Sequence, residues 1–449
     1  MTVRKVRWRT HLMLAPVLIL TIIIGTLAYL LHGTAAAVPE DQLFGPHPKI
    51  TEPKTEWLLP SLHISSVVGW QGDAKPVAGA GLQVNAFATG LDHPRWLLSL
   101  PNGDVLVSES NSPARPPVGF MDWIATKLMS HANGSDHSPN KIILLRDTTG
   151  NGTADQRFTL LEGLHSPSGM ALVGNTLYVA NTDALVAYPY TLGDTKISAP
   201  PVKIIDLPAN APNMHWARNV IASPDGKLLY VTVGSNSNIA DEGIEAEASR
   251  AAVLEVDPAK KDFRIFATGL RNPNGLAIEP HSKAIWATVN ERDQLGPDLP
   301  PDYMTRLEFG ADYGWPYSYW GGYMDTRVDP NDPGRLQYYK RPEYALGAHT
   351  ASLGIVFSGD AKLGGAFSRG AFVAQHGSWN RRPQTGYRML YIPFGENDYP
   401  NGKPVEVLNG FLDKDGNAQG RPVDVVVDKT GALLVSDDAG NRVWRVTQK

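Results

Sequence analysis

Histidine and arginine side chains recur at one position of a repeated sequence pattern. Each copy begins with a glycine or a short polar segment, often Gly-Leu-x-x-Pro, and continues with an apolar strand, a turn and a second apolar strand. The residues at the start of the six copies are His93 and Arg95, His165, His215 and Arg218, Arg271 and Asn272, His349, and Arg421. A purely structural repeat would carry the same small or apolar residue there each time. Because guanidinium groups pair carboxylates through two parallel hydrogen bonds, a ring of Arg and His suits an anionic, planar ligand with several carboxylates.

Three other stretches contain candidate ligand-binding residues. The segment Val289–Tyr303 is dense in side-chain oxygens, which suits either a metal site or an ordinary acidic surface loop. The segment Ala374–Arg382 follows a strand and contains His376, Trp379 and Arg381, and this combination is typical of the wall of a ligand site. The run Asp147–Asp155 resembles a calcium loop, although such Asx-Gly runs are equally common in hairpin turns.

The repeated strands must position these side chains. They are short, rich in β-branched and aromatic residues, and bounded by Gly, Asn or Asp. Asn102-Gly103 and Asp225-Gly226 are hairpin-turn signals, since both residue types tolerate positive φ. Connecting strands at Lys141–Leu145, Ala252–Val256 and Arg388–Ile392 bring each unit to about four strands. The sequence therefore predicts an all-β protein, a six-bladed β-propeller whose equivalent positions face one central mouth.

The chain outside the repeats divides into three parts. Residues 1–37 hold a basic flank and an apolar segment, residues 38–80 read as a Pro-rich linker with a first strand, and residues 81–449 form the propeller. An insertion at Asn111–Asn140 contains one expected helix, Met121–His131, and is expected to cover one face.

The N-terminus predicts export. Arg4, Lys5, Arg7 and Arg9 precede Leu12–Leu31, an almost wholly apolar run long enough to cross a bilayer as a helix. By the positive-inside tendency, the rest of the chain lies outside the cytoplasm, on the periplasmic side of the inner membrane. An uncleaved anchor is favoured over a signal peptide cleaved near the small residues 33–37.

Composition excludes several classes. The 449 residues contain 41 basic and 45 acidic side chains, and this near-neutral balance argues against nucleic-acid binding. The absence of cysteine rules out disulfides, thiolate metal sites and a catalytic thiol. The sequence has no P-loop, G-x-S-x-G, H-E-x-x-H or dinucleotide-binding fingerprint.

Several motifs in order resemble the glucose/sorbosone dehydrogenase family, over about residues 80–447. They are His215-Trp-Ala-Arg-Asn, Ser223-Pro-Asp-Gly, Val233-Gly-Ser-Asn-Ser-Asn, Gly269-Leu-Arg-Asn-Pro-Asn-Gly-Leu-Ala, Asn290-Glu-Arg-Asp with Leu299-Pro-Pro-Asp-Tyr, and Asp312-Tyr-Gly-Trp-Pro-Tyr. The sorbosone branch is the more similar one. The resemblance implies a six-bladed propeller that holds pyrroloquinoline quinone (PQQ) and calcium at its mouth and oxidises sugars or sugar aldehydes.

The resemblance also implies roles for individual residues. His215 matches the general base, Arg271 and Asn272 a cofactor-contacting pair, and Arg421 a partner of a cofactor carboxylate. The backbone carbonyls of Asn290, Glu291 and Arg292 match a calcium turn, although soluble glucose dehydrogenases have Gly-Pro there. The family's lysine near the quinone is missing here, and His376 or Arg381 is the expected substitute. The other expected contacts are Arg218, His165 and Trp379 to the cofactor and Trp379 with Tyr313 to the sugar.

The sequence thus predicts a PQQ-dependent sugar or sugar-aldehyde dehydrogenase that passes electrons to a respiratory acceptor and reaches the membrane through its N-terminal helix. Two alternatives remain open. A calcium-dependent propeller lactonase or hydrolase needs carboxylate and Asn ligands converging at the mouth, and a non-enzymatic binding propeller needs no polar mouth.

Overall fold

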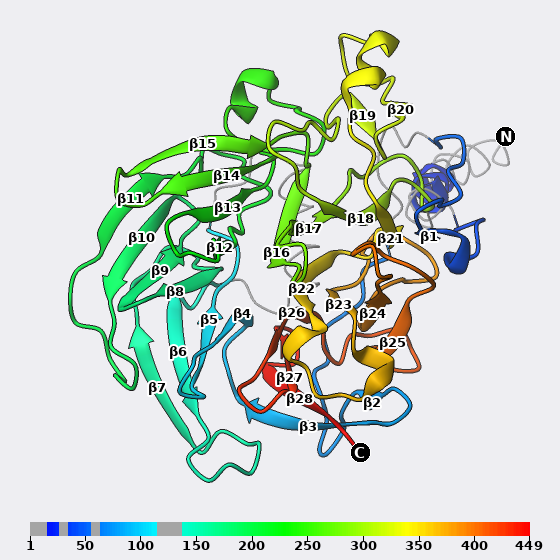
Figure 1. The fold of residues 1–449 in the computed structure, drawn as a ribbon. Helices are drawn as coiled ribbons and strands as arrows, with labels where there is room; N and C mark the ends of the chain where they lie inside the picture. Colours follow the sequence, from blue (N-terminus) through cyan, green and yellow to red (C-terminus); the bar gives the residue numbers. More distant parts are fainter. Residues whose placement is uncertain (1–15, 27–34, 55–62, 115–136) are drawn as a thin grey trace, which may run out of the picture.

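The computed structural model describes residues 16–26, 35–54, 63–114 and 137–449, and Figure 1 shows their arrangement as a ring of sheets. Six antiparallel sheets stand around a central axis, which confirms the predicted six-bladed propeller. The expected helix Met121–His131 lies outside the described residues, as do residues 1–15 and 27–34 of the N-terminal segment. Residues 16–26 form a helix, and within the described ranges no helix has both the length and the apolar composition needed to cross a membrane.

Each blade runs from an inner strand to an outer strand in chain order. Blades 1 and 2 contain β4 (Pro94–Ser99), β5 (Val105–Glu109), β6 (Lys141–Arg146), β7 (Gln156–Leu161), β8 (Met170–Val173), β9 (Thr176–Ala180), β10 (Ala184–Pro189) and β11 (Val202–Asp206). Blades 3 and 4 contain β12 (Val220–Ala222), β13 (Leu229–Val233), β14 (Ala252–Asp257), β15 (Asp262–Ala267), β16 (Asn272–Ile278), β17 (Ile285–Asn290), β18 (Pro301–Arg306) and β21 (Tyr344–Ala348). Blades 5 and 6 contain β22 (Ser352–Phe357), β23 (Gly370–Gln375), β24 (Arg388–Pro393), β25 (Val405–Asn409), β26 (Pro422–Val427), β27 (Leu433–Asp437) and β28 (Arg442–Gln448).

An N-terminal strand closes the ring. Strand β3 (Leu82–Thr89) pairs antiparallel with β28 and supplies the outer strand of blade 6. The residues read as a linker also pack on the propeller, because β1 (Phe44–Gly45) extends blade 4 and β2 (Val77–Ala78) extends blade 5. Two-residue edge strands have no periodicity, so the sequence does not reveal them. The remaining short elements are the hairpin β19 (Ser318–Tyr319) and β20 (Tyr323–Met324) and the 3-10 turns η1 (Glu40–Gln42), η2 (Ile244–Glu247), η3 (Pro333–Tyr338), η4 (Ser358–Asp360) and η5 (Gly365–Phe367).

Four of the inner strands contain a bulge near their first residue. In blades 1, 4, 5 and 6 the register between the inner strand and its partner shifts within three residues of the start, as at Pro273/Leu276. Such a bulge takes backbone amides out of the ladder. In blades 1, 4 and 6 a hydroxyl on the second strand accepts a hydrogen bond from such an amide: Trp96 N to Ser108 Oγ at 2.9 Å, Gly275 N to Thr288 Oγ1 at 2.9 Å, and Asp424 N to Ser436 Oγ at 2.9 Å. Blade 3 has an equivalent bond from Asn219 N to Thr232 Oγ1 at 2.7 Å.

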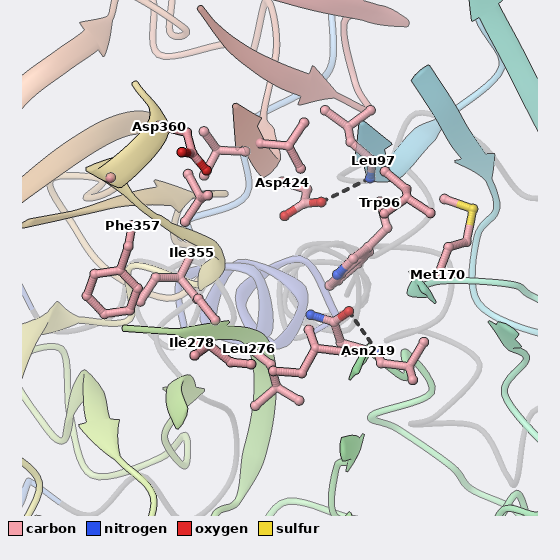
Figure 2. Close-up of a pocket in the computed structure, with 18 of the residues that line it drawn as sticks. Trp96, Leu97, Met170, Asn219, Leu276, Ile278, Ile355, Phe357, Asp360 and Asp424 are labelled. Atoms are coloured by element: carbon pink, nitrogen blue, oxygen red, sulfur yellow. Dashed lines mark hydrogen bonds between the residues drawn. The ribbon is translucent and has the colours of Figure 1, made fainter. Parts of the chain in front are cut away.

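The inner strands enclose a channel with a cavity of about 320 Å³. Most of the residues that line it are apolar, and Figure 2 shows Asp424 and Asn219 projecting into it from opposite sides. Asp424 accepts a hydrogen bond from Leu97 N at 2.9 Å, and Gly354 leaves it room, since a Cβ there would lie 2.3 Å from Asp424 Oδ1. Burial raises the pKa of Asp424 from 3.8 to about 7. The carboxyl is therefore easier to protonate in the folded protein than in the unfolded chain.

This raised pKa predicts a pH-dependent stability. The folded state holds the Asp424 proton more tightly than the unfolded state, so the wild type loses stability as pH rises from about 4 to about 7, by at most about 4 kcal/mol. Asp424→Asn removes the ionisation, and the variant should gain stability relative to wild type over this range, measured by urea unfolding at several pH values. Asp360→Asn, at an exposed residue of the same cavity, is the control and should follow the wild type. An Asp424→Asn curve parallel to the wild-type curve would show that the carboxyl ionises as freely in the fold as outside it.

Candidate active site at the mouth of the propeller

The predicted histidines and arginines meet at one end of the ring. Neighbouring strands of a blade are antiparallel, so the loops before the inner strands and the loops between second and third strands emerge at the same end. These loops carry His93, His215 and His349 before inner strands and His376 after a second strand. We call this end the mouth. The strand order therefore places His93, His215 and His349, which the repeat predicts to share one rim, at the same end as His376.

His215 is held in one tautomer at the mouth. Its Nδ1 lies 3.0 Å from Ser235 O and 2.9 Å from Ser235 Oγ, and that hydroxyl donates its own proton to Ser237 O at 2.7 Å. Both atoms facing Nδ1 are thus acceptors, so Nδ1 carries the proton and Nε2 keeps its lone pair. Burial, together with the positive charge of Arg271, lowers the pKa of His215 well below 6.5. The ring is therefore neutral at pH 7 and able to accept a proton at Nε2.

A glycine allows His215 and Asn272 to approach the same strand end. A Cβ on Gly234 would lie 2.5 Å from His215 Cβ and 2.6 Å from Asn272 Oδ1, closer than side-chain contacts allow. The sequence motif that begins at Val233 thus has a steric reason for its glycine.

Arg218 supports His215 from behind. Its guanidinium is fully buried and donates to His215 O at 2.5 Å, to Pro208 O at 2.7 Å and to Asn213 Oδ1 at 3.1 Å. Burial lowers the pKa of Arg218 to about 9. With these donors used by protein acceptors, Arg218 positions the His215 loop, which is a different role from the cofactor contact expected from the sequence.

Asp438 gathers three of the predicted side chains. Arg95 Nη1 donates to it at 2.6 Å, His376 Nε2 lies 3.0 Å from both of its oxygens, and His93 Nε2 lies 3.6 Å away. Burial by itself raises the pKa of a carboxyl, but the two histidines and Arg95 outweigh it and hold the pKa of Asp438 well below its ordinary value. Burial lowers the pKa of His376 to about 4. Asp438 is therefore an anion beside a neutral His376.

Arg421 carries a buried charge without a counter-ion. Its side chain lies on the ring of Tyr387, at 5.1 Å from the centroid, and Nη2 donates to Tyr387 Oη at 2.7 Å. Its Nε is buried with no hydrogen-bond partner, and within the described part of the chain no carboxylate pairs with the guanidinium. A buried cation of this kind favours an anionic ligand, because the ligand supplies the missing charge and acceptors.

Arg271 bonds the turn that the resemblance assigns to calcium. Its Nη1 donates to Glu291 O at 2.6 Å and to Asn290 O at 3.4 Å, and its Nη2 pairs with Asp293 at 3.0 Å. Burial raises the pKa of the Glu291 side chain to about 7, and Arg292 forms a buried ion pair with Asp325. The described residues contain no group of three or more His, Asp or Glu side chains arranged to hold a metal ion. The guanidinium of Arg271 thus occupies one side of the carbonyls proposed for calcium, and the turn fits a metal ion poorly.

His349 and Asn380 join Asp293 in a second polar group. Asn380 Nδ2 donates to Asp293 Oδ1 at 2.8 Å and to His349 Nδ1 at 3.2 Å, and Asn380 Oδ1 is buried without a partner. Trp379, next in the chain, is half-buried, which leaves part of its ring available to a ligand.

Three predicted residues do not join these groups. His165 pairs with Asp183 at 2.8 Å on the exposed rim. Arg381 is buried against Asp298 at 3.2 Å and donates to Pro297 O and Val38 O, so it anchors the N-terminal segment. Tyr313 as a wall of the sugar site is wrong, because its ring is 1% exposed in an apolar core and its hydroxyl donates to Arg306 O. The Asp147 carboxylate accepts backbone amides of its own turn, including Gly150 N and Gly152 N, both at 2.7 Å.

Sequence reasoning missed Ser235 and Asp438, which orient the two histidines. Both follow the end of a second strand, as His376 does. Asn181 and Glu291 occupy the corresponding place in blades 2 and 4. The recurrence of a polar residue just after the second strand of successive repeats is the sequence signal that points to them.

Comparison with known proteins supports the fold and the family. The profile of the TrAA12-like family matches residues 137–299 and 324–449. A Borreliella burgdorferi protein of uncharacterised function is 28% identical over 298 residues, which is 64% of this chain and 77% of that protein. A pyrroloquinoline quinone-dependent pyranose dehydrogenase of Coprinopsis cinerea is 27% identical over 224 residues, which is 40% of this chain and 30% of that enzyme.

Solved structures show the same architecture. The Trichoderma reesei carbohydrate-active enzyme of family AA12, in its iodide structure, superposes with a TM-score of 0.68 at 18% identity, covering 87% of this chain and 100% of that one. The holo PQQ domain of the Coprinopsis cinerea pyranose dehydrogenase also gives a TM-score of 0.68, at 19% identity, covering 86% of this chain and 100% of that one. At such identities the likeness establishes the propeller fold alone.

The crowding at Gly234 gives a direct test of the site geometry. Gly234→Ala forces its Cβ against His215 and Asn272, and the variant should lose about 1–3 kcal/mol of unfolding free energy in urea. Gly365→Ala, at a glycine with open space around it, is the control and should change stability by less than about 0.5 kcal/mol. Equal stability of the two variants would contradict the close approach of His215 to this strand end.

Proposed function

The chain belongs to the TrAA12-like family, among the glucose/sorbosone dehydrogenase-like propellers that its motifs predict, and on that premise we propose that it is a PQQ-dependent oxidoreductase acting on a sugar or sugar aldehyde. The observation that carries the proposal is the uncompensated, buried guanidinium of Arg421 at a mouth that also holds neutral histidines. A planar cofactor with three carboxylates meets the needs of such a mouth. PQQ, when bound, supplies a two-electron acceptor for the hydride of the substrate.

Four side chains at the mouth offer different kinds of contact to that cofactor. Arg421 offers its remaining amino group to a carboxylate, and Asn272 presents a half-buried amide beside His215. Trp379 offers a partly open aromatic face, and His376 has a lone pair on Nδ1, because Nε2 faces Asp438. These groups come from blades 3 to 6, so they surround a ligand at the mouth.

His215 is the proposed general base. Ser235 fixes the proton on Nδ1, so Nε2 is free to take the proton of the substrate hydroxyl or hydrate as the hydride departs. Arg218 donates a hydrogen bond to the backbone carbonyl of His215 and so fixes the backbone that carries the ring. The oxidation thus places two protons and two electrons on base and cofactor together, and an external acceptor must remove the electrons.

The turn at Asn290 and Glu291 suits calcium less well than the mouth suits PQQ. The Asn290 and Glu291 carbonyls already accept hydrogen bonds from Arg271, so an ion there must share them with a guanidinium. Calcium therefore enters none of the steps above. Its requirement remains a prediction from the resemblance.

Export is a further part of the proposal. The basic residues Arg4, Lys5, Arg7 and Arg9 ahead of the apolar run support a location on the periplasmic side of the inner membrane, with electrons passed to a respiratory acceptor. Fractionation of cells that express the full chain tests this, and recovery from the cytosol alone would contradict it.

Reconstitution of the full chain with PQQ tests the function. The protein should reduce an artificial electron-acceptor dye in the presence of an aldose, a pyranose or sorbosone, and should lose this activity when PQQ is omitted. The same assay with chelator, and with calcium restored, measures the calcium requirement. PQQ-independent hydrolysis of lactones would instead favour a hydrolase, and absence of PQQ binding would leave a binding propeller.

Two substitutions should separate chemistry from cofactor binding. His215→Ala should keep PQQ affinity and lower turnover by about 100-fold or more, because the base is lost. Arg421→Gln should weaken PQQ binding about 10- to 100-fold, because a charge-assisted contact is lost. Arg264→Gln, on exposed β15, is the matched control. Since the pKa of His215 lies well below 6.5, wild-type turnover should persist as pH falls to 6.5 and decline only below it. Full turnover by His215→Ala would exclude this base.

A further inference from the structure

Asp438 is a buried carboxylate at the mouth that none of the sequence motifs includes. Its side chain is 2% exposed and follows β27 directly. It accepts a hydrogen bond from Arg95 at 2.6 Å and faces His376 at 3.0 Å. These partners come from blade 1 and blade 5, so Asp438 in blade 6 links three blades at the mouth.

Arg95 is held in place by more than this ion pair. Its guanidinium lies 5.4 Å from the ring of Trp96 and 5.6 Å from the ring of Trp216, the residue after His215. Cation–π contacts of this kind restrain the plane of a guanidinium. Asp438 therefore connects, through Arg95, to the loop that carries His215.

The contact with Asp438 also fixes the proton of His376. Arg95 keeps Asp438 ionised, and an ionised carboxylate only accepts hydrogen bonds. His376 Nε2 must therefore donate, so a neutral ring has its lone pair on Nδ1. Within the described residues Nδ1 has no hydrogen-bond partner, whereas the backbone amide of His376 donates to Ala351 O at 2.9 Å.

We propose that Asp438 is a positioning residue for the cofactor: it holds the proton of His376 on Nε2 and fixes Arg95, so that His376 Nδ1 and the cationic mouth present a preset pattern to the ligand. The proposal rests on PQQ being that ligand. It assigns the two mouth histidines opposite tautomers, since Ser235 holds the proton of His215 on Nδ1. A donor group of the cofactor is then recognised by His376, and the proton of the substrate is taken by His215.

The pair of substitutions Asp438→Asn and His376→Gln tests this role by PQQ titration. An amide oxygen cannot serve both Arg95 and His376, so Asp438→Asn should raise the PQQ dissociation constant about 10- to 100-fold. The KM for sugar at saturating PQQ should stay unchanged. Because Asp438 acts in part through His376, the double variant should lose less affinity than the sum of the two single losses. Asp206→Asn, in an exposed pair with Lys203, is the matched control and should bind PQQ as wild type does. Wild-type affinity in a folded Asp438→Asn protein, or fully additive losses in the double variant, would overturn the proposal.

A spectroscopic measurement decides the tautomer without any cofactor. In apo wild type with ¹⁵N-labelled histidine, the His376 signals, assigned by their absence in His376→Gln, should show the proton on Nε2. A proton on Nδ1 would overturn the proposal, even if Asp438→Asn failed to fold. Asp438→Glu, which keeps the charge, should preserve the Nε2 proton. If wild type does not bind PQQ, the proposed function fails, while the nitrogen spectra still decide what Asp438 does to His376.

Discussion

The mouth depends on closure of the ring between the first and last blades. Strand β3 pairs with β28, so a segment near residue 85 completes a sheet whose other strands lie near residue 440. Closing the ring places every blade between two neighbouring blades. Buried hydrogen bonds then join blade 6 to blade 1. Arg95 donates to Asp438, Leu97 N donates to Asp424, and Ser436 Oγ donates to Arg95 O at 2.5 Å. These contacts join residues more than 320 positions apart in the chain, as the 327-residue separation of Leu97 and Asp424 shows. The pairing of Asp438 with Arg95 at the mouth therefore exists only after the ring has closed.

The sequence predicts what the repeat itself encodes. Each predicted pair of strands appears as the first and second strand of a blade, because apolar runs bounded by Gly, Asn and Asp specify hairpins locally. The shared rim of His93, His215, His349 and Arg421 follows from the repeat and the antiparallel order. By contrast, the packing of β1 and β2 on blades 4 and 5 involves two residues each, too few for any periodicity. The placement of Tyr313 in a core also depends on a chain path between blades that the local sequence does not encode.

Sequence reasoning is least informative about the arginines, because residue type does not say how many acceptors surround a guanidinium. Arg218 and Arg271 both follow the same pattern in neighbouring repeats, yet one donates to backbone carbonyls behind His215 and the other to the Asn290–Glu291 turn. Arg381 lies beside a tryptophan and an asparagine of the mouth but turns to Asp298 and the N-terminal segment. Within the part of the chain that the structure describes, the Arg421 guanidinium contacts the hydroxyl and ring of Tyr387 and pairs with no carboxylate. The structure therefore identifies Arg421 as the guanidinium with room for a ligand, because fewer protein acceptors surround it than surround the other three.

Burial has opposite consequences for the acids and bases around the axis. Burial raises the pKa of Asp424 in the channel to about 7, whereas Asp438 at the mouth contacts His376, His93 and Arg95 and its pKa falls. Both carboxyls belong to blade 6. Asp424 lies in the inner strand β26, and Asp438 directly follows the second strand β27. Contact with His376, His93 and Arg95 thus holds the pKa of Asp438 low, whereas burial dominates at Asp424 and raises its pKa. Since Asp438 neutralises Arg95, Arg421 is the guanidinium at blade 6 that has no paired carboxylate among the described residues, and an anionic ligand should orient one of its carboxylates toward blade 6.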